Sequence, residues 1–315
     1  MGLFVIFAVI NPVFFDAAVF ASLLVLLSLG LTLTYLTTKV PNFAHASFAT
    51  LGVYMTLIAV RVWETNPYIA VPIAFVMSGL VAIALYIFIL KPLARRGATG
   101  SIQMIATLAF DMILIAGLNI LADYLTDGFR IKSREFTLRS YDLEFMDLPM
   151  IVMIAPLAVA IIGIVLYLVL KKTKFGIAVR ASTENPDLSG TVGINVNAVY
   201  GVAWMIAGGL AGIAGALMAL WFLGDPNLGP LLIPSVFAAS IAGGLTSIFG
   251  AVAGGLLVGL AEVLGTRFLA GEIGSWLIAY RPLIPLIIIA VTLLFVPNGL
   301  AGINWSKVRS KVWRR

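Results

Sequence analysis

The sequence contains no cysteine and one histidine among 315 residues, and only 11% of its residues are charged. Disulfides and thiolate chemistry are therefore excluded, and the usual metal sites, which cluster His and Cys ligands, are not expected. The chain has no G-x-x-x-x-G-K-[ST] loop, so it lacks a P-loop that would hold and hydrolyse ATP. No Ser/His/acid or paired-carboxylate motif occurs at a recognisable spacing. We therefore expect neither an enzyme nor a bound cofactor.

Apolar residues dominate instead, at 61% of the chain, and the mean hydropathy is +1.09. Runs of about 20 apolar residues recur, and each is long enough to cross a hydrocarbon core as a helix. The sequence predicts an all-α polytopic membrane protein of about 8–9 transmembrane helices in one domain, residues 1–315. The expected spans are 14–37, 44–62, 68–90, 101–122, 149–170, 198–223, 235–247, 248–268 and 276–296. Segment 235–247 is too short to cross upright, which makes it a candidate for a broken or re-entrant helix.

Lys and Arg residues indicate the orientation, because short basic connections are retained in the cytoplasm. With the N-terminus outside and the C-terminus cytoplasmic, 13 of the 20 basic residues lie inside. They gather at the ends of the spans, in loop 171–197 and in the tail 304–315, a distribution that does not suggest nucleic-acid binding. External loop 123–148 alternates apolar with polar residues around Phe136 and Leu143, and a small β-hairpin is predicted there.

Glycines define two helix-packing faces. On a helical net Gly201, Gly208, Gly212 and Gly215 form one stripe, and Gly255 and Gly259 form another together with Glu262. Glu262 is therefore expected to face protein rather than lipid. The strings "AGGLAGIAGA" (207–216) and "AGGLTSIFGA" (242–251) match at seven of ten positions. An internal duplication and convergence of glycine-rich contacts both explain this match.

A few polar residues fall within the predicted spans. Asp111 follows Gln103 and Thr107 at four-residue steps, so the three form a polar stripe. A charge at this depth needs a partner or a polar cavity, so either a substrate or proton pathway or an interhelical hydrogen bond is expected. His45 is placed at the membrane interface at the start of a span, as a structural hydrogen-bonding group or a ligand. Arg267 and Arg281 are expected to anchor span ends in water.

Loop 171–197 contains signals for a short helix. Asn185 is an N-cap candidate, Pro186 suits the first helical position, Asp187 suits the first turn, and Gly193 suits the C-terminal stop. The sequence therefore predicts a helix of about seven residues on the cytoplasmic side. It is either a docking element for a cytoplasmic partner or a solvated connector.

Four stretches of the chain resemble a known family. They are "GLTLTYLTTKVPNFAHASFATLGVYM", "TKFGIAVRASTENPDLSGTVGIN", "AGGLAGIAGAL" with "IAGGLTSIFGAVAGGLLVGLAEVLG", and "YRPLIPLIIIAVTLLFVPNGLAGIN". In this order they resemble the LivH-type permeases of ABC importers for branched-chain amino acids. Because the "NFAHA" string is part of this resemblance, Asn42 and His45 are added to the candidate pathway residues. The chain departs from the family pattern at Ile177, Ala46, Val296 and Ala301.

The resemblance implies that loop 171–197 is a coupling helix that seats on an ATPase subunit. Carried over by position, that role falls on Gly176, Arg180, Ala181, Glu184, Asn185, Pro186, Leu188, Gly193 and Ile194. The resemblance also implies a second permease subunit, two cytoplasmic ATP-binding subunits and an extracytoplasmic substrate-binding protein, in the cytoplasmic membrane of a prokaryote. Branched-chain amino acids are the expected substrate, with aromatic amino acids, urea and short amides as alternatives. The rival hypotheses are a proton-coupled secondary transporter that uses Asp111 and Glu262, and a passive channel or scaffold subunit.

Overall fold

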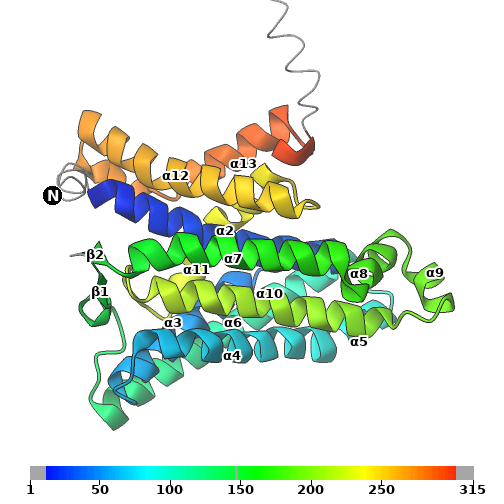
Figure 1. Ribbon diagram of the computed structural model, residues 1–315, viewed down its shortest axis with the longest axis horizontal. Coiled ribbons are helices and arrows are strands. Elements are labelled where there is room, and N and C mark those ends of the chain that lie inside the picture. Colours follow the sequence, from blue (N-terminus) through cyan, green and yellow to red (C-terminus); the bar gives the residue numbers. More distant parts are fainter. Residues whose placement is uncertain (1–11, 146–147, 303–315) are drawn as a thin grey trace, which may run out of the picture.

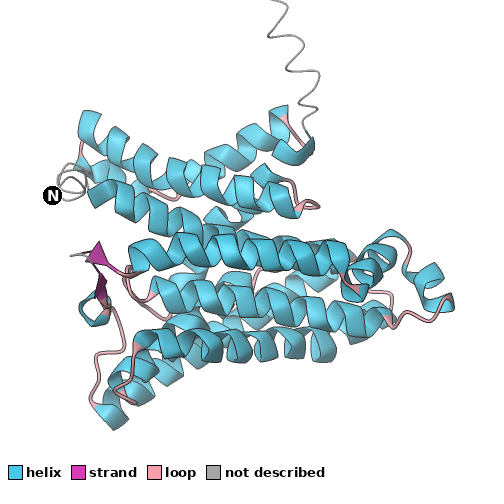
Figure 2. Ribbon diagram, viewed as in Figure 1, coloured by secondary structure: helices cyan, strands magenta, loops and turns pink. Residues whose placement is uncertain are grey.

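The computed structural model describes residues 12–145 and 148–302, so the basic tail 304–315 lies outside the described residues. Helices make up most of this part of the chain (Figure 2). The first half contains α2 (Pro12–Thr38), α3 (His45–Arg61), η1 (Pro67–Ile69), α4 (Ala70–Leu85), η2 (Tyr86–Leu90), α5 (Lys91–Arg95) and α6 (Gly100–Phe129). After η3 (Arg139–Tyr141), β1 (Glu144–Phe145) and β2 (Leu148–Pro149) come α7 (Ile151–Lys172), α8 (Lys174–Glu184), α9 (Pro186–Thr191), α10 (Val196–Met218), α11 (Leu228–Gly243), α12 (Ile248–Glu272), η4 (Ser275–Tyr280), α13 (Leu283–Phe295) and η5 (Leu300–Gly302).

Seven helical segments are long and apolar enough to cross a membrane, which confirms the all-α polytopic fold. They are Pro12–Thr38, Pro67–Arg95, Gly100–Phe129, Ile151–Lys172, Val196–Met218, Ile248–Glu272 and Leu283–Gly302. The other two predicted spans form the shorter helices α3, of 17 residues, and α11, of 16 residues. At 1.5 Å per residue each of these is about 25 Å long, less than a hydrocarbon core of ~30 Å.

The predicted start of α11 and the predicted crossing of α3 need correction, whereas the bounds of α3 agree with the predicted span 44–62. Helix α11 begins at Leu228, seven residues before the predicted start at 235, and continues through Pro234. Helix α3 was predicted as an ordinary crossing, but its first residue lies against the middle of α2, where His45 Nε2 is 3.0 Å from the carbonyl oxygen of Leu27. The chain between α2 and α3 therefore turns back into the bundle before the helix starts.

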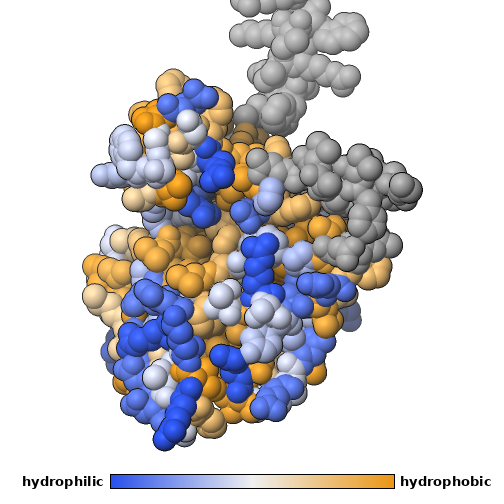
Figure 3. Space-filling model, turned by 90° about the vertical axis from the view of Figure 1, so that its left-hand side faces the viewer, coloured by the Kyte–Doolittle hydropathy of each residue, from blue (hydrophilic) through white to orange (hydrophobic). Residues whose placement is uncertain are grey.

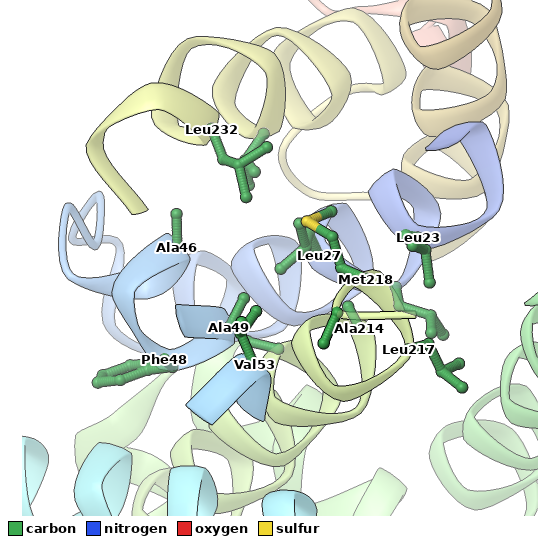
Figure 4. Close-up of a cluster of buried hydrophobic side chains, with 14 of the residues drawn as sticks. Leu23, Leu27, Ala46, Phe48, Ala49, Val53, Ala214, Leu217, Met218 and Leu232 are labelled. Carbon is green, nitrogen blue, oxygen red and sulfur yellow. The ribbon is translucent and has the colours of Figure 1, made fainter. Parts of the chain in front are cut away.

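Helices α2 and α10 form the centre of the bundle. In Figure 1, α12 and α13 lie on one side of α2, whereas α7, α10, α4 and α6 lie on the other side. Most of α2 and α10 is buried, whereas little of α6, α7 and α13 is buried. The apolar core gathers where these central helices meet α3 and α11, and it includes Leu27, Phe48, Leu217 and Leu232 (Figure 4). The exposed outer helices carry the apolar surface expected of a protein in lipid.

Helix α10 packs on α3 and α4 through its glycines. A Cβ atom at Gly208 would lie 2.7 Å from the Ser78 carbonyl oxygen, and one at Gly212 would lie 2.7 Å from Ser78 Oγ. A Cβ atom at Gly215 would overlap the backbone of Ala49 in α3. Gly201 differs, because its nearest neighbour would be an Ile83 side-chain atom at 3.6 Å. The predicted stripe therefore makes close contacts at its last three glycines, while Gly201 has room beside it.

Helix α12 packs in the same way between α2 and α11. Cβ atoms at Gly255 and Gly259 would meet the backbone of α2 at Val25 and Ala21, and one at Gly254 would meet the carbonyl oxygen of Ala239 in α11. Ser28 Oγ also donates to the Ala251 carbonyl oxygen at 2.9 Å. These contacts confirm that the Gly255 and Gly259 face is a packing face.

The repeated strings adopt different structures. Residues 207–216 are continuous helix within α10, whereas residues 242–251 comprise the end of α11, a turn and the start of α12. Gly244 in that turn has φ +101°, a backbone conformation that glycine adopts at little cost. Gly243 and Gly250 meet across the turn. The shared string therefore supports convergence on close backbone contacts rather than duplication of one structural unit.

The loop at the β1 and β2 end of the bundle differs from the predicted hairpin. The two paired strands are later and shorter than expected, with Glu144 opposite Pro149 and Phe145 opposite Leu148. Phe136 instead forms an isolated bridge with Gly224, and its ring packs against Tyr54 at 5.8 Å. Viewed from this end, the surface carries many hydrophilic side chains (Figure 3). The loop is therefore held by contacts to other segments more than by its own strands.

The glycine contacts lead to a stability prediction. We expect Gly212→Ala to lower the stability of the chain by about 1–3 kcal/mol, because the added methyl group overlaps the carbonyl of Ala74. The matched control is Gly117→Ala in α6, where nothing lies within 4 Å of the added carbon. Thermal unfolding of both purified variants in the same detergent measures the difference. Equal melting temperatures would contradict the role assigned to Gly212.

Candidate functional site

The segment between α2 and α3 is held inside the bundle by polar contacts. Phe43 N donates to Thr107 Oγ1 at 3.1 Å, and Thr107 Oγ1 in turn is 2.7 Å from the Met104 carbonyl oxygen. Asn42 is fully buried, and its Oδ1 accepts a hydrogen bond from Ala44 N at 3.1 Å. Non-helical backbone at membrane depth is tolerated where protein groups satisfy it. Asn42 and Thr107 therefore support an irregular backbone within the bundle.

Asp111 lies beside the first turn of α3. Its Oδ1 accepts a hydrogen bond of 2.5 Å from Ser47 Oγ, and the residue is 5% exposed. The N-terminal turn of a helix carries unpaired N–H groups and a partial positive charge, which stabilise a nearby carboxylate. Of the two roles predicted for Asp111, this arrangement favours the interhelical hydrogen bond.

His45 connects the start of α3 to α2. Because a carbonyl oxygen can only accept, the 3.0 Å contact with Leu27 places the proton on Nε2. Gly30 makes room for the imidazole, since a Cβ atom there would lie 2.7 Å from His45 Cε1. The predicted interface position is wrong because the chain re-enters the bundle before α3 begins. The hydrogen bond itself matches the structural role considered for this residue.

Helix α11 begins next to the same site. A Cβ atom at Gly229 would lie 2.9 Å from Ser47 Cα, so the first turns of α3 and α11 touch. The rings of Phe43 and Phe237 also pack at 5.0 Å. We call Asn42, His45, Ser47, Thr107, Asp111 and Gly229 the polar junction. Sequence reasoning missed Ser47 and Gly229, because hydropathy does not indicate that two helices start inside the membrane.

Gln103 and Glu262 lie apart from the polar junction. Gln103 Nε2 donates to the Ala98 carbonyl oxygen at 3.0 Å near the start of α6. Glu262, on α12, is 2.8 Å from Arg281 Nε. Glu262 is buried, as predicted, but Arg281 is not a simple water-exposed anchor, because it pairs with Glu262 and its guanidinium lies 4.4 Å from the Phe20 ring centroid. The two intramembrane carboxyl groups thus have different partners on different helices.

Helices α8 and α9 occupy the predicted coupling loop. Asn185 Oδ1 accepts a hydrogen bond from Leu188 N at 3.0 Å, Pro186 follows it, and Gly193 has φ +90° after the helix. These observations confirm the predicted short helix and both of its ends. Helix α8 was not predicted. It starts at an additional N-cap, Thr173, whose Oγ1 accepts from Gly176 N at 3.3 Å.

The residues predicted to act in coupling differ in their surroundings. Gly176 and Arg180 face α7, because Arg180 Nη1 donates to the Leu170 carbonyl oxygen and a Cβ at Gly176 would overlap that same carbonyl. Ala181 and Ile194 are half-buried, whereas Glu184, Asn185, Pro186 and Gly193 are exposed. Leu188 is 61% exposed and Val192 is 71% exposed. In Figure 1, α9 lies beyond the ends of the long helices.

Comparison with known proteins supplies a family. Residues 13–297 match the family described as the permease component of branched-chain amino acid transport systems. A probable branched-chain amino acid transport permease, LivH of Methanocaldococcus jannaschii, is 42% identical over 293 residues, covering 93% of each chain. The LivH permease of Salmonella typhimurium is 24% identical over 302 residues, which cover 91% of this chain and 94% of that protein. Among solved structures, PsaBC from Streptococcus pneumoniae in complex with Fab has a TM-score of 0.49 at 14% identity, covering 90% of this chain and 91% of that one.

The buried ion pair leads to a second stability prediction. Arg281→Met leaves the Glu262 carboxylate buried without its cation, and breaking a fully buried pair costs about 3–5 kcal/mol. Because the Arg281 side chain is 32% exposed, we expect a smaller loss, about 1–3 kcal/mol. The double variant Glu262→Gln with Arg281→Met removes both charges and should recover part of the loss. Thermal unfolding of the two variants checks this, and a double variant less stable than the single one would refute it.

Proposed function

Because this chain belongs to the family of permease components of branched-chain amino acid transport systems, we propose that it is the membrane subunit of an ATP-driven importer for these amino acids. Leucine, isoleucine and valine are the proposed substrates, in keeping with the names of the relatives. The absence of a P-loop from the sequence means that this chain cannot itself supply the energy from ATP. Two ATP-binding subunits on the cytoplasmic side are therefore part of the proposal.

The observation that carries the proposal is the apolar pair at the end of α9, Leu188 and the C-cap residue Val192. These side chains lie four positions apart, so they occupy neighbouring places on one side of the helix end. Both are more than half exposed, in a segment between two spans that contains the basic residues Lys171, Lys172 and Lys174. Exposed apolar side chains rimmed by polar residues are typical of a surface that binds another protein. We assign this pair to contact with an ATPase subunit.

The packing of the chain supports a pathway between two permease subunits. Helices α2 and α10 fill the centre of the bundle, and the polar junction is buried, with Asp111 bonded to Ser47 and Thr107 bonded to the backbone N–H of Phe43. A path through the middle of one chain would need those contacts to open. We therefore propose a second permease subunit beside this one. We also propose that this chain has its N-terminus outside and its C-terminus in the cytoplasm. Loop 123–148 would then face a substrate-binding protein at the outer surface of a prokaryotic cytoplasmic membrane.

A proton-coupled transporter is the second candidate, since Asp111 and Glu262 are intramembrane carboxyl groups. Asp111 is hydrogen-bonded to Ser47, whereas Glu262 is paired with Arg281. A proton relay needs a chain of titratable groups, and these two residues have separate partners, Ser47 in α3 and Arg281 between η4 and α13. This arrangement favours the ATP-driven importer.

The role of α9 can be tested in a reconstituted complex with the ATPase subunits, a second permease and a binding protein. We expect Val192→Asp to weaken assembly by about 30-fold, as for the loss of an interface hot spot, and to abolish substrate-stimulated ATP hydrolysis. The melting temperature of the permease alone should not change, because the Val192 side chain is 71% exposed.

The matched control is Ile273→Asp, an equivalent change at an exposed apolar residue just after α12. Ile273 is 57% exposed and lies away from α8 and α9. ATP hydrolysis and uptake should remain at the wild-type level in this variant. The proposed role of α9 in ATPase docking would be contradicted if the two substitutions lowered ATP hydrolysis equally, or if Val192→Asp hydrolysed ATP at the wild-type rate.

The energy source is tested with proteoliposomes. We expect a pH gradient, without nucleotide, to drive no uptake of labelled leucine by this chain alone, because Asp111 and Glu262 have separate partners, Ser47 and Arg281. Uptake driven by the gradient and lost in Asp111→Asn would establish the proton-coupled alternative. Downhill flux without either energy source would indicate a channel instead. In the full complex, competition by urea or short amides would broaden the substrate class.

A further inference from the structure

A cavity of about 500 Å³ lies where α9 meets the ends of α2, α5, α6 and α10. Its lining includes the cationic side chains of Lys39, Lys91 and Arg95, with Asp187 of α9 on another wall. Tyr86 and Tyr200 separate it from the core, where Tyr86 stacks on buried Trp204 at 6.2 Å. Three cations and one carboxylate leave a net charge of about +2 in the lining, which suits an anionic ligand.

The three cations are available to such a ligand. In residues 12–145 and 148–302 the ion pairs are Arg134 with Asp123 and Arg281 with Glu262, so none of the three is paired with a carboxylate. Lys39 has φ +56°, an uncommon backbone conformation for a residue with a side chain. Its Nζ lies 5.8 Å from the Tyr35 ring centroid. Three unpaired cations in one concave site are more than a solvated loop requires.

An apolar groove of about 330 Å³ continues from this cavity between α4 and α10. The two spaces share Tyr86, Lys91 and Asn197, and the groove extends past Ile83, Ile87, Gly201 and Val202. Ile87 and Val202 are 41% and 42% exposed on the outside of the bundle. Lys91 and Ile83 lie eight residues apart, so the groove extends about 12 Å along the helix. A Cβ atom at Gly201 would have no neighbour closer than 3.6 Å, so this glycine leaves the groove floor open.

A π-helical turn forms the wall common to the cavity and the groove. In η2 the backbone N–H of Lys91 donates to the carbonyl oxygen of Tyr86, five residues earlier. Single π-helical turns inside α-helices are rare, and they frequently occur at functional sites. Here the turn places Tyr86, Ile87 and Lys91 around the junction of the charged and apolar spaces.

We propose that the cavity and groove together bind an anionic phospholipid. Its phosphate would contact Lys39, Lys91 and Arg95, and one hydrocarbon chain would follow the groove past Ile87 and Gly201. Basic pockets at the ends of membrane helices are suited to lipid head groups. A soluble phosphate would use the cations but would leave the contiguous apolar groove without a role. Because Asp187 forms part of the wall, a bound lipid would also lie against α9.

The proposal goes beyond transport, so binding is measured directly. Native mass spectrometry of the purified full chain, titrated with phosphatidylglycerol or phosphatidylcholine, gives an affinity for each lipid. We expect a preference for phosphatidylglycerol, and a loss of about fivefold in that affinity for each of Lys91→Gln and Arg95→Gln. Arg96→Gln is the matched control, since Arg96 is exposed in the next position and lies outside both linings.

A groove variant distinguishes lipid from soluble phosphate. Gly201→Leu fills the groove floor and should weaken phosphatidylglycerol binding. Its melting temperature should change by no more than that of the Arg95→Gln variant. The lipid proposal is overturned if inorganic phosphate displaces phosphatidylglycerol at millimolar concentration while Gly201→Leu has no effect. It is also overturned if phosphatidylcholine binds equally well, or if Arg96→Gln weakens binding as much as Arg95→Gln. Arg95 is exposed, so its variant keeps the test valid if Gly201→Leu fails to fold.

Discussion

Close approach of helix backbones at small residues is the constraint on which this structure depends. Lipid offers no hydrophobic drive to bring apolar helices together, so association relies on dispersion contacts and interhelical hydrogen bonds. The glycines of α10 bring it against α3 and α4, and those of α12 bring it against α2 and α11. Ser78 Oγ, which donates to the Phe48 carbonyl oxygen at 2.9 Å, adds a polar contact at the meeting point of α3, α4 and α10. Most of each central helix is then buried.

This packing allows two helices to start inside the bundle. Helices α3 and α11 are too short to cross upright, and their first turns meet at Ser47 and Gly229. Such starts leave backbone N–H groups in a region without water. The polar junction lies at these starts, with Thr107 and Asp111 reaching the segment from α6. The polarity of Thr107 and Asp111 therefore has a structural explanation that does not require substrate.

Local signals predicted much of this arrangement. Hydropathy located the seven long apolar helices of the described residues and the shorter α3 and α11, and the caps at Asn185 and Gly193 were correct because they depend on adjacent residues alone. The depth of His45, the partner of Arg281 and the start of α11 could not be found in this way. Each depends on how far the chain turns back between helices, and hydropathy contains no signal for an extended segment enclosed by protein. The repeated glycine string left two explanations open for a related reason, since glycine serves both close packing and tight turns.

The connections of α9 link its surface to the core. Helix α8 is fixed to α7 by Arg180 and to α10 by Tyr200, whose hydroxyl donates to the Ser182 carbonyl oxygen at 2.8 Å. Helix α9 leads through Gly193 directly into α10, whose first turn is capped by Asn195. A displacement of Leu188 and Val192 would therefore also move α10, the helix whose glycines touch both α3 and α4. The same displacement would change the shape of the cavity lined by Lys39, Lys91 and Arg95, because Asp187 of α9 forms part of its wall. Partner contact and lipid contact would then act on the position of one short helix.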